Sequence, residues 1–301
     1  MVIQATTLHY LAIRLDDKFL TKFAHTLFVL LTPLFFERVA FNNAHGTPIL
    51  NTQALTDLTV PTAAVGLSYY FRNIASKRVY LIGGFLALLG IFGREFDGNA
   101  RFLIVAIEVM TFAFVSFKMK DEIIGRFSHI FNSAIAFWLF RRLMDNASGT
   151  PMLNSSALID MLVIASGAFI PFILSNTKAK RPYWIVCHIF VLMWFLRELT
   201  PLENGQGMAS IAWGVYAIAL FIIGLRKSWY QLTKAAIVTL LVLVIKLFIV
   251  DLANLETLWR VLLFMGFGGV FLTLSYYFKN LWKDGDEIKS EVEIDDSEQE
   301  K

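Results

Sequence analysis

Long apolar runs separated by short polar junctions occupy almost the whole chain. Each run is long enough to cross, as a helix, a hydrocarbon core about 30 Å thick. The pattern predicts ten membrane-spanning helices, at 22–40, 54–72, 79–96, 100–118, 123–144, 156–176, 183–200, 208–226, 229–251 and 257–281. We therefore expect an all-α fold, a polytopic transmembrane helical bundle.

The composition agrees with a membrane-embedded chain. Of 301 residues, 56% are hydrophobic and 17% are charged, whereas a soluble domain has about 45–50% apolar and about 25% charged residues. This apolar excess is too large to bury in one core, so a water-soluble enzyme is excluded. The single cysteine, Cys187, excludes an intrachain disulfide, a cysteine-based zinc site and an iron–sulfur cluster. The lipid bilayer is the expected partner, and we predict no nucleic-acid partner, metal or cofactor.

Basic residues gather at every second junction between the predicted spans. These junctions carry Arg72, Lys77 and Arg78; Lys118, Lys120 and Arg126; Lys178, Lys180 and Arg181; and Arg226 and Lys227. The other junctions are polar or acidic. Because Lys and Arg accumulate in short cytoplasmic loops, the basic junctions are predicted to be cytoplasmic. Both chain termini then lie in the cytoplasm.

The sequence repeats itself with a period of about 104 residues. Three pairs of segments match in register: HGTPILNTQALTD (45–57) with SGTPMLNSSALID (148–160), IFGREF (91–96) with WFLREL (194–199), and KFAH (22–25) with RFSH (126–129). Each copy holds four spans, an even number, so the copies are predicted to run in parallel orientation. Such repeats often carry a site at their interface.

The repeat predicts how the chain is divided. We expect an N-terminal segment (1–21), a first four-helix unit (22–122), a second four-helix unit (123–228), a closing hairpin (229–283) and an acidic, disordered tail (284–301). Residues 7–23 align with 111–127, the end of a predicted span and its loop. The N-terminal segment is therefore interpreted either as the end of a truncated membrane helix or as an interfacial helix.

Residues 197–228 and 245–282 carry a resemblance to a known family. The matching features are an AW-x-x-Y-A-x-A-L helix ending at Gly224, the K-x-F-x-x-D-L segment from Lys246 to Leu252, and L-x-R-V-L-x-F-x-G-x-G at the start of the last span. They resemble the C-terminal portion of the bacterial membrane proteins catalogued as domain of unknown function 2339. The resemblance implies a multi-pass protein of the bacterial inner membrane and brings no established activity.

Charged residues lie near the predicted outer ends of the spans and once near mid-membrane. The candidate cleft residues are Glu37, Arg38, Asp57, Arg94, Glu95, Glu108, Arg141, Arg142, Asp160, Arg197, Glu198, Lys246, Asp251 and Arg260. A charge at the centre of a membrane helix costs about 2.5–3.5 kcal/mol on insertion scales, so such residues face protein or a wet cavity. We expect most of them to converge on an outward-facing polar cleft. The alternative is that each snorkels or pairs locally to fix helix register.

The Arg94–Glu95 and Arg197–Glu198 pairs occupy equivalent positions of the repeat. Adjacent residues point about 100° apart on a helix, so we expect each member to find a partner other than its neighbour.

Glu108 lies about 12 Å along its helix from the outer end. It is either a proton or cation carrier, or a protonated or paired glutamate that locks two helices.

The remaining motifs have structural interpretations. His25 and His129, at the cytoplasmic ends of two spans, are expected to be structural. In the two G-T-P-x-L-N loops, Asn51 or Thr52, and Asn154 or Ser155, are predicted to cap the next helix.

Three functional classes stay open on the sequence alone. The first is a transporter or flippase-like component for a polar or anionic envelope substrate. The second is a non-catalytic membrane scaffold that assembles with other envelope membrane proteins. The third is a transferase that uses Asp57 or Asp160 as a base; we take an enzyme to be the least favoured of the three.

Overall fold

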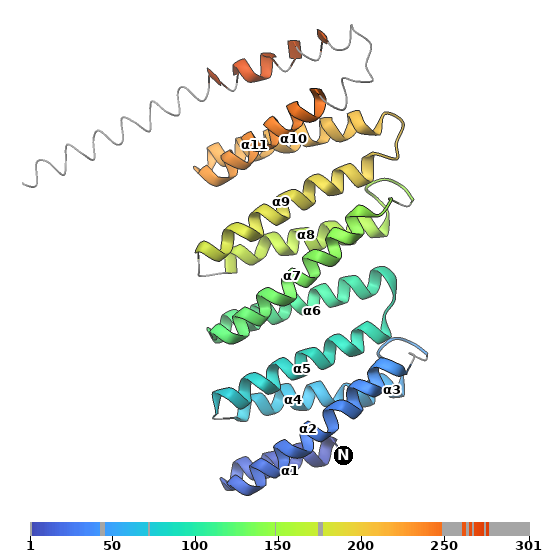
Figure 1. Cartoon of the computed structure of the whole chain (residues 1–301), viewed down its shortest axis with the longest axis vertical. Helices are drawn as coiled ribbons and strands as arrows, with labels where there is room; N and C mark the ends of the chain where they lie inside the picture. Colours follow the sequence, from blue (N-terminus) through green and yellow to red (C-terminus); the bar gives the residue numbers. More distant parts are fainter. Residues whose placement is uncertain are drawn as a thin grey trace, which may run out of the picture. The chain divides into compact units, whose positions relative to one another are not determined.

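The structure is a computed structural model in which residues 2–42, 46–71, 73–147, 149–173 and 177–248 are described, with short helical stretches at 261–262, 265–266, 268–273 and 275–276. The regular structure of these residues is helical throughout (Figure 1). The helices are α1 (Val2–Leu15), α2 (Lys18–Phe41), α3 (Thr52–Asp57), α4 (Thr59–Tyr70), α5 (Ile74–Glu95), α6 (Gly98–Met119), α7 (Glu122–Met144), α8 (Ser155–Ile173), α9 (Thr177–Leu199), α10 (Gly205–Arg226) and α11 (Tyr230–Lys246).

Among the described residues, seven helices are long and apolar enough to cross a membrane: α2, α5, α6, α7, α8, the Lys180–Leu199 part of α9, and α10. The all-helical, multi-pass prediction is therefore confirmed. Helix α11 has 17 residues, and the predicted span 257–281 lies largely outside the described residues.

The predicted span 54–72 is divided into α3 and α4 at Leu58. Pro61 explains the division, because proline has no backbone N–H and Asp57, four residues earlier, loses a helical hydrogen bond. Leu58 keeps right-handed helical angles (φ −61°, ψ −19°). The two helices therefore follow one another directly, and Asp57 lies at the junction between them.

The chain divides into two units, Met1–Gly205 and Gln206–Lys301. In the first unit, α1 and α5 each pack on both α2 and α4, and in the same way α6 and α9 each pack on both α7 and α8. Figure 1 shows these helices lying side by side. We call α1–α5 the first helix group and α6–α9 the second helix group.

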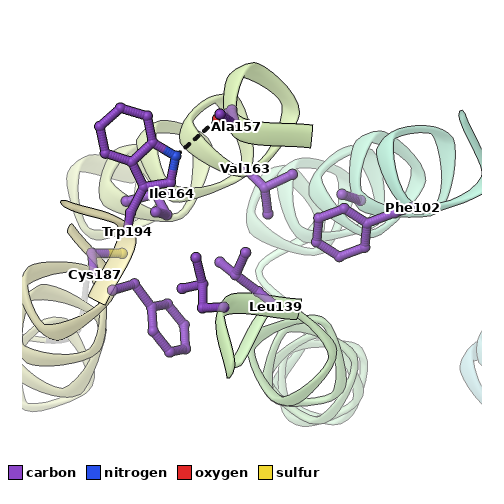
Figure 2. Close-up of a cluster of buried hydrophobic side chains, with 10 residues drawn as sticks. Phe102, Leu139, Ala157, Val163, Ile164, Cys187 and Trp194 are labelled. Atoms are coloured by element: carbon purple, nitrogen blue, oxygen red, sulfur yellow. Dashed lines mark hydrogen bonds between the residues drawn. The ribbon is translucent and has the colours of Figure 1, made fainter. Parts of the chain in front are cut away.

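The second helix group has a core of large side chains. Leu139 of α7, Val163 of α8 and Cys187 and Trp194 of α9 are buried together, with Phe102 of α6 beside them (Figure 2). The indole N–H of Trp194 donates to the carbonyl oxygen of Ala157 at 3.0 Å, which fixes α9 against α8. The corresponding cluster between α2 and α5 of the first group contains Phe35, Val39, Ala87 and Ile91, a smaller set of side chains.

Candidate functional site

The charged residues at the end of the first helix group form a closed set of contacts. Arg94 Nη1 lies 2.6 Å from Asp57 Oδ2, and Arg94 Nε donates to Glu95 Oε1 at 2.9 Å. The other Glu95 oxygen, Oε2, accepts from Asn51 Nδ2 at 2.5 Å and from the backbone N–H of Ile49 at 3.3 Å. Helix α5 supplies the arginine and the glutamate, and the α3–α4 junction supplies the aspartate. We call this arrangement the first ion cluster.

A second ion cluster at the end of the second helix group has the same contacts. Arg197 Nη1 lies 2.6 Å from Asp160 Oδ2, and Arg197 Nε donates to Glu198 Oε1 at 2.8 Å. Glu198 Oε2 accepts from Asn154 Nδ2 at 2.8 Å and from the backbone N–H of Met152 at 3.1 Å. Each of these residues lies 103 positions after its counterpart in the first cluster.

The loop before α3 contacts Glu95, and the loop before α8 contacts Glu198 in the same way. Asn51 caps α3 by accepting from the Ala54 N–H at 2.7 Å, and Asn154 accepts from the Ala157 N–H at the same distance. The asparagine alternatives for the two predicted caps are therefore confirmed. Ile49 and Met152 have positive φ angles of 66° and 62°, and their backbone N–H groups are the ones that bind the glutamates.

The two clusters show how costly buried charges are accommodated. Asp160 and Glu198 have side chains that are 0% exposed, and each carboxylate faces at least one guanidinium. Each member of the Arg94–Glu95 and Arg197–Glu198 pairs has a partner other than its neighbour, as expected, but the two neighbours also contact each other. The long arginine side chain bends back to its neighbour while its second nitrogen reaches the aspartate.

A second arginine, from α2 or α7, also binds the aspartate of each cluster. These two arginines differ in their exposure and in their other contacts. Arg142 of α7 binds Asp160 at 2.7 Å, donates to Asn99 of α6 at 2.8 Å and is 17% exposed. Arg38 of α2 binds Asp57 through Nε at 3.1 Å and is 43% exposed. Within the described residues, the terminal nitrogens of Arg38 have no hydrogen-bond partner.

A groove of about 1100 Å³ lies along α2, α4 and α5 beside the first ion cluster. Arg38 and Asp57 line one end, and His25 and Tyr80 line the other. Between these ends the lining is mostly apolar and includes Phe35, Val60, Gly83 and Leu86, among others. The two charged or polar ends are separated by 13 residues of α2, about 20 Å.

The structure brings together only part of the residues predicted for one cleft. Glu37 and Arg141 are exposed. Lys246 belongs to the second unit, where its Nζ donates to Ser210 Oγ at 2.5 Å and to the Gln206 carbonyl. Asp251 and Arg260 lie outside the described residues. The remaining outer-end residues fall into the two ion clusters.

Glu108 is separate from both ion clusters. It is buried in α6, and neither carboxyl oxygen has a hydrogen-bond partner among the described residues. Arg197 is engaged by Asp160 and Glu198. An ionised carboxylate buried without a partner is strongly disfavoured, so this position stands out from the other buried acids.

Two further contacts were not anticipated from the sequence. His25 Nδ1 lies 2.9 Å from Tyr80 Oη, and His129 Nδ1 lies 2.8 Å from Tyr183 Oη. The tyrosines are 55 and 54 residues away from the histidines, a separation that no short motif reveals. Within the described ranges, no group of three or more His, Cys, Asp and Glu side chains is arranged to bind a metal.

An ion pair also joins two junctions that were predicted to be cytoplasmic. Arg78 Nε lies 2.7 Å from Asp121 Oδ2, and Asp121 Oδ1 caps α7 by accepting from the N–H groups of Ile123 and Ile124. Burial would raise the pKa of Asp121, but the hydrogen bonds from Arg78 and the two backbone amides outweigh burial and hold that pKa below its ordinary value.

Comparison with known proteins gives one match. Residues 2–281 match the family model described as "Predicted membrane protein (DUF2339)", so the similarity extends well beyond the C-terminal region that carries the resemblance most specifically. No curated protein and no solved structure matches the sequence. Because the match covers far more than half of the chain, this protein belongs to the DUF2339 family of predicted membrane proteins.

Proposed function

We propose that this membrane protein is a transporter or flippase-like component that handles an anionic, amphipathic substrate of the bacterial envelope. The observation that carries the proposal is the groove along α2, α4 and α5, with Arg38 at one end. An apolar groove on membrane-spanning helices suits a hydrocarbon chain. A half-exposed guanidinium at its end suits a phosphate or carboxylate headgroup, because arginine binds such groups through two parallel hydrogen bonds.

The contacts of Arg38 leave it able to take such a ligand. Its Nε is held by Asp57 at 3.1 Å, while its terminal nitrogens have no partner among the residues described. Arg94 is 4% exposed and is already engaged by Asp57 and Glu95. Of the two arginines beside the groove, Arg38 is therefore the one we assign to the headgroup.

The proposal is tested by lipid movement in liposomes. Purified protein is reconstituted with fluorescent phosphatidylglycerol, and dithionite quenching measures how fast label from the inner leaflet becomes accessible. We expect the protein to accelerate this movement, and Arg38→Gln to reduce it more for phosphatidylglycerol than for phosphatidylcholine. The control is Arg101→Gln, because Arg101 is 38% exposed and pairs with Asp97 away from the groove. Movement no faster than in protein-free liposomes would overturn the proposal.

The alternative function is a non-catalytic scaffold that assembles with other envelope membrane proteins. The ion clusters favour it, because most of their charged groups are satisfied by one another. The transferase hypothesis has less support: Asp57 and Asp160 are each held by two arginines, whereas a catalytic base needs a free carboxylate. A scaffold predicts no lipid movement in the liposome experiment.

We further propose ten spans, arranged as two copies of a four-helix unit with a period of about 104 residues and a closing hairpin. The support is the shared packing of the two helix groups and the 103-residue offset between their ion clusters. In this proposal both termini lie in the cytoplasm and the ion clusters lie toward the outer side. This topology is tested by introducing single cysteines into alternate loops of the protein and labelling intact cells with a thiol reagent that does not cross the membrane. Only cysteines on the outer side should react.

A further inference from the structure

Three side chains from three helices bring their hydrogen-bonding atoms to one point beside the groove. His9 Nε2 of α1 lies 3.1 Å from His25 Nδ1 of α2, and Tyr80 Oη of α5 lies 2.9 Å from that Nδ1 and 3.2 Å from the His9 Nε2. His9 is 0% exposed and Tyr80 is 8% exposed. Two imidazole nitrogens and a phenol oxygen thus form a nearly equilateral triangle in the interior of the first helix group.

The size of the triangle suits a metal ion. Nitrogen and oxygen ligands lie about 2.0–2.2 Å from zinc in a tetrahedral site, so neighbouring ligand atoms are about 3.3–3.6 Å apart. The three edges of 2.9, 3.1 and 3.2 Å are slightly shorter. An ion that sits above the triangle would need each side chain to move by only a few tenths of an ångström.

We propose that His9, His25 and Tyr80 bind a divalent transition-metal ion of the zinc and copper class. Imidazole nitrogens suit these ions, and the phenol completes three ligands by losing its proton: M²⁺ binds the two imidazoles and the tyrosinate oxygen, and one H⁺ is released. The fourth position would be open to the groove, because His25 and Tyr80 line it. A water molecule or an anionic group in the groove would occupy it.

The second helix group contains a natural comparison for this site. His129 and Tyr183 repeat the contact of His25 with Tyr80, at 2.8 Å. The alignment of residues 7–23 with 111–127 places Ala113, which is buried in α6, where His9 stands. The second group therefore has two of the three ligands and should bind the ion much more weakly.

The test measures Zn²⁺ binding to the full chain purified in detergent without a polyhistidine tag. We expect Zn²⁺ to raise the Tm, and calorimetry to show that His9→Gln and Tyr80→Phe each weaken binding by at least about tenfold. His129→Gln and Tyr183→Phe are the matched controls and should bind Zn²⁺ like the unmodified protein. Tyr80→Phe removes one oxygen only, so it tests the proposal even where a histidine variant fails to fold.

A second measurement needs no variant. Cu²⁺ added to the unmodified protein should produce a visible tyrosinate-to-copper charge-transfer absorption, because the phenolate donates to the metal. The proposal is overturned if this absorption is absent, if Zn²⁺ leaves the Tm unchanged, or if Tyr80→Phe and His9→Gln bind Zn²⁺ as tightly as the two controls. None of these readouts depends on lipid transport, so the metal site and the proposed function can fail separately.

Discussion

The two helix groups share their ion clusters and their His–Tyr contacts but differ in how their interiors are filled. In the second group, Cys187 and Phe190 of α9 belong to the buried core. At the positions 103 residues earlier, α5 of the first group has Gly84 and Ala87, and Ala87 lines the groove together with the neighbouring Gly83. Polar contacts that align helices can thus be kept while apolar side chains differ and a groove is present in one group.

The glycines of α5 have different roles in this difference. A Cβ added at Gly84 would lie 3.0 Å from Val65 Cγ2, so this glycine allows α4 and α5 to approach closely. A Cβ added at Gly83 would meet nothing within 4 Å, so this glycine leaves space open in the groove. Of these two glycines, only Gly83 can be replaced by a larger residue without moving α4.

The largest effect is expected from breaking the buried ion cluster of the second group. Asp160→Ala leaves Arg142 and Arg197 without their shared carboxylate, and such a loss costs about 3–5 kcal/mol. Asp57→Ala should cost less, because the half-exposed Arg38 can turn to water. Unfolding in detergent measures both, with Asp97→Ala as the control because Asp97 is 93% exposed. Equal losses at Asp57 and Asp160 would contradict the distinction between the clusters.

Removing the largest side chain that distinguishes the two interiors should also be severe. Phe190 is 8% exposed, and Phe190→Ala gives α9 the residue that α5 has at Ala87. We expect a loss of about 3 kcal/mol, from lost apolar burial and the cavity left behind. Phe137→Ala on the exposed face of α7 is the control (Phe137 is 67% exposed). A loss at Phe190 no larger than at Phe137 would show that the second core is not closed by this ring.

The helix caps at Asp121 and Asp17 give a smaller, pH-dependent contrast. Asp121 and Asp17 both cap the next helix, but only Asp121 also binds an arginine, Arg78. Asparagine caps a helix about as well as aspartate, so Asp121→Asn loses mainly the charge that binds Arg78 and should destabilise the protein at neutral pH by about 1 kcal/mol. Asp17→Asn should cost less, because Asp17 has no such pair.

The sign of the pH effect follows from the lowered pKa of Asp121. The ionised carboxylate contributes its full stability above the unfolded pKa of about 3.9, and this contribution is lost as the pH falls through the lower folded pKa. The stability difference between the unmodified protein and Asp121→Asn should shrink below about pH 4. A difference that grows on acidification would contradict the assignment to the Arg78 pair.

The sequence was sufficient to predict the features that depend on local pattern. The apolar runs place α2 and α5–α10 closely, and the matching segments 45–57 and 148–160 predict that Asp57 and Asp160 occupy equivalent positions. The break at Leu58 follows from Pro61, so it too has a local cause in the sequence.

Features that depend on contacts between distant helices could not be predicted in this way. The groove exists because small residues on α5 face α2, and hydropathy does not distinguish Ala87 from Phe190 as core residues. The triangle of His9, His25 and Tyr80 joins residues 16 and 55 positions apart. The contact between Arg94 and Glu95 depends on an arginine rotamer that helix geometry alone does not fix.

The mildest change in stability is expected from filling the groove itself. Gly83→Leu places a side chain in open space on α5 and should change the Tm little, because leucine also favours a helix. The side chain should nevertheless displace a bound hydrocarbon chain. Native mass spectrometry of protein purified with phosphatidylglycerol should then show fewer retained lipids.

Gly93→Leu is the matched control: Gly93 lies on the same helix, an added Cβ there also meets nothing within 4 Å, and Gly93 is not part of the groove lining. Equal lipid retention in the two variants would mean that the groove of the first helix group does not bind lipid. The two helix groups would then differ in side-chain packing alone.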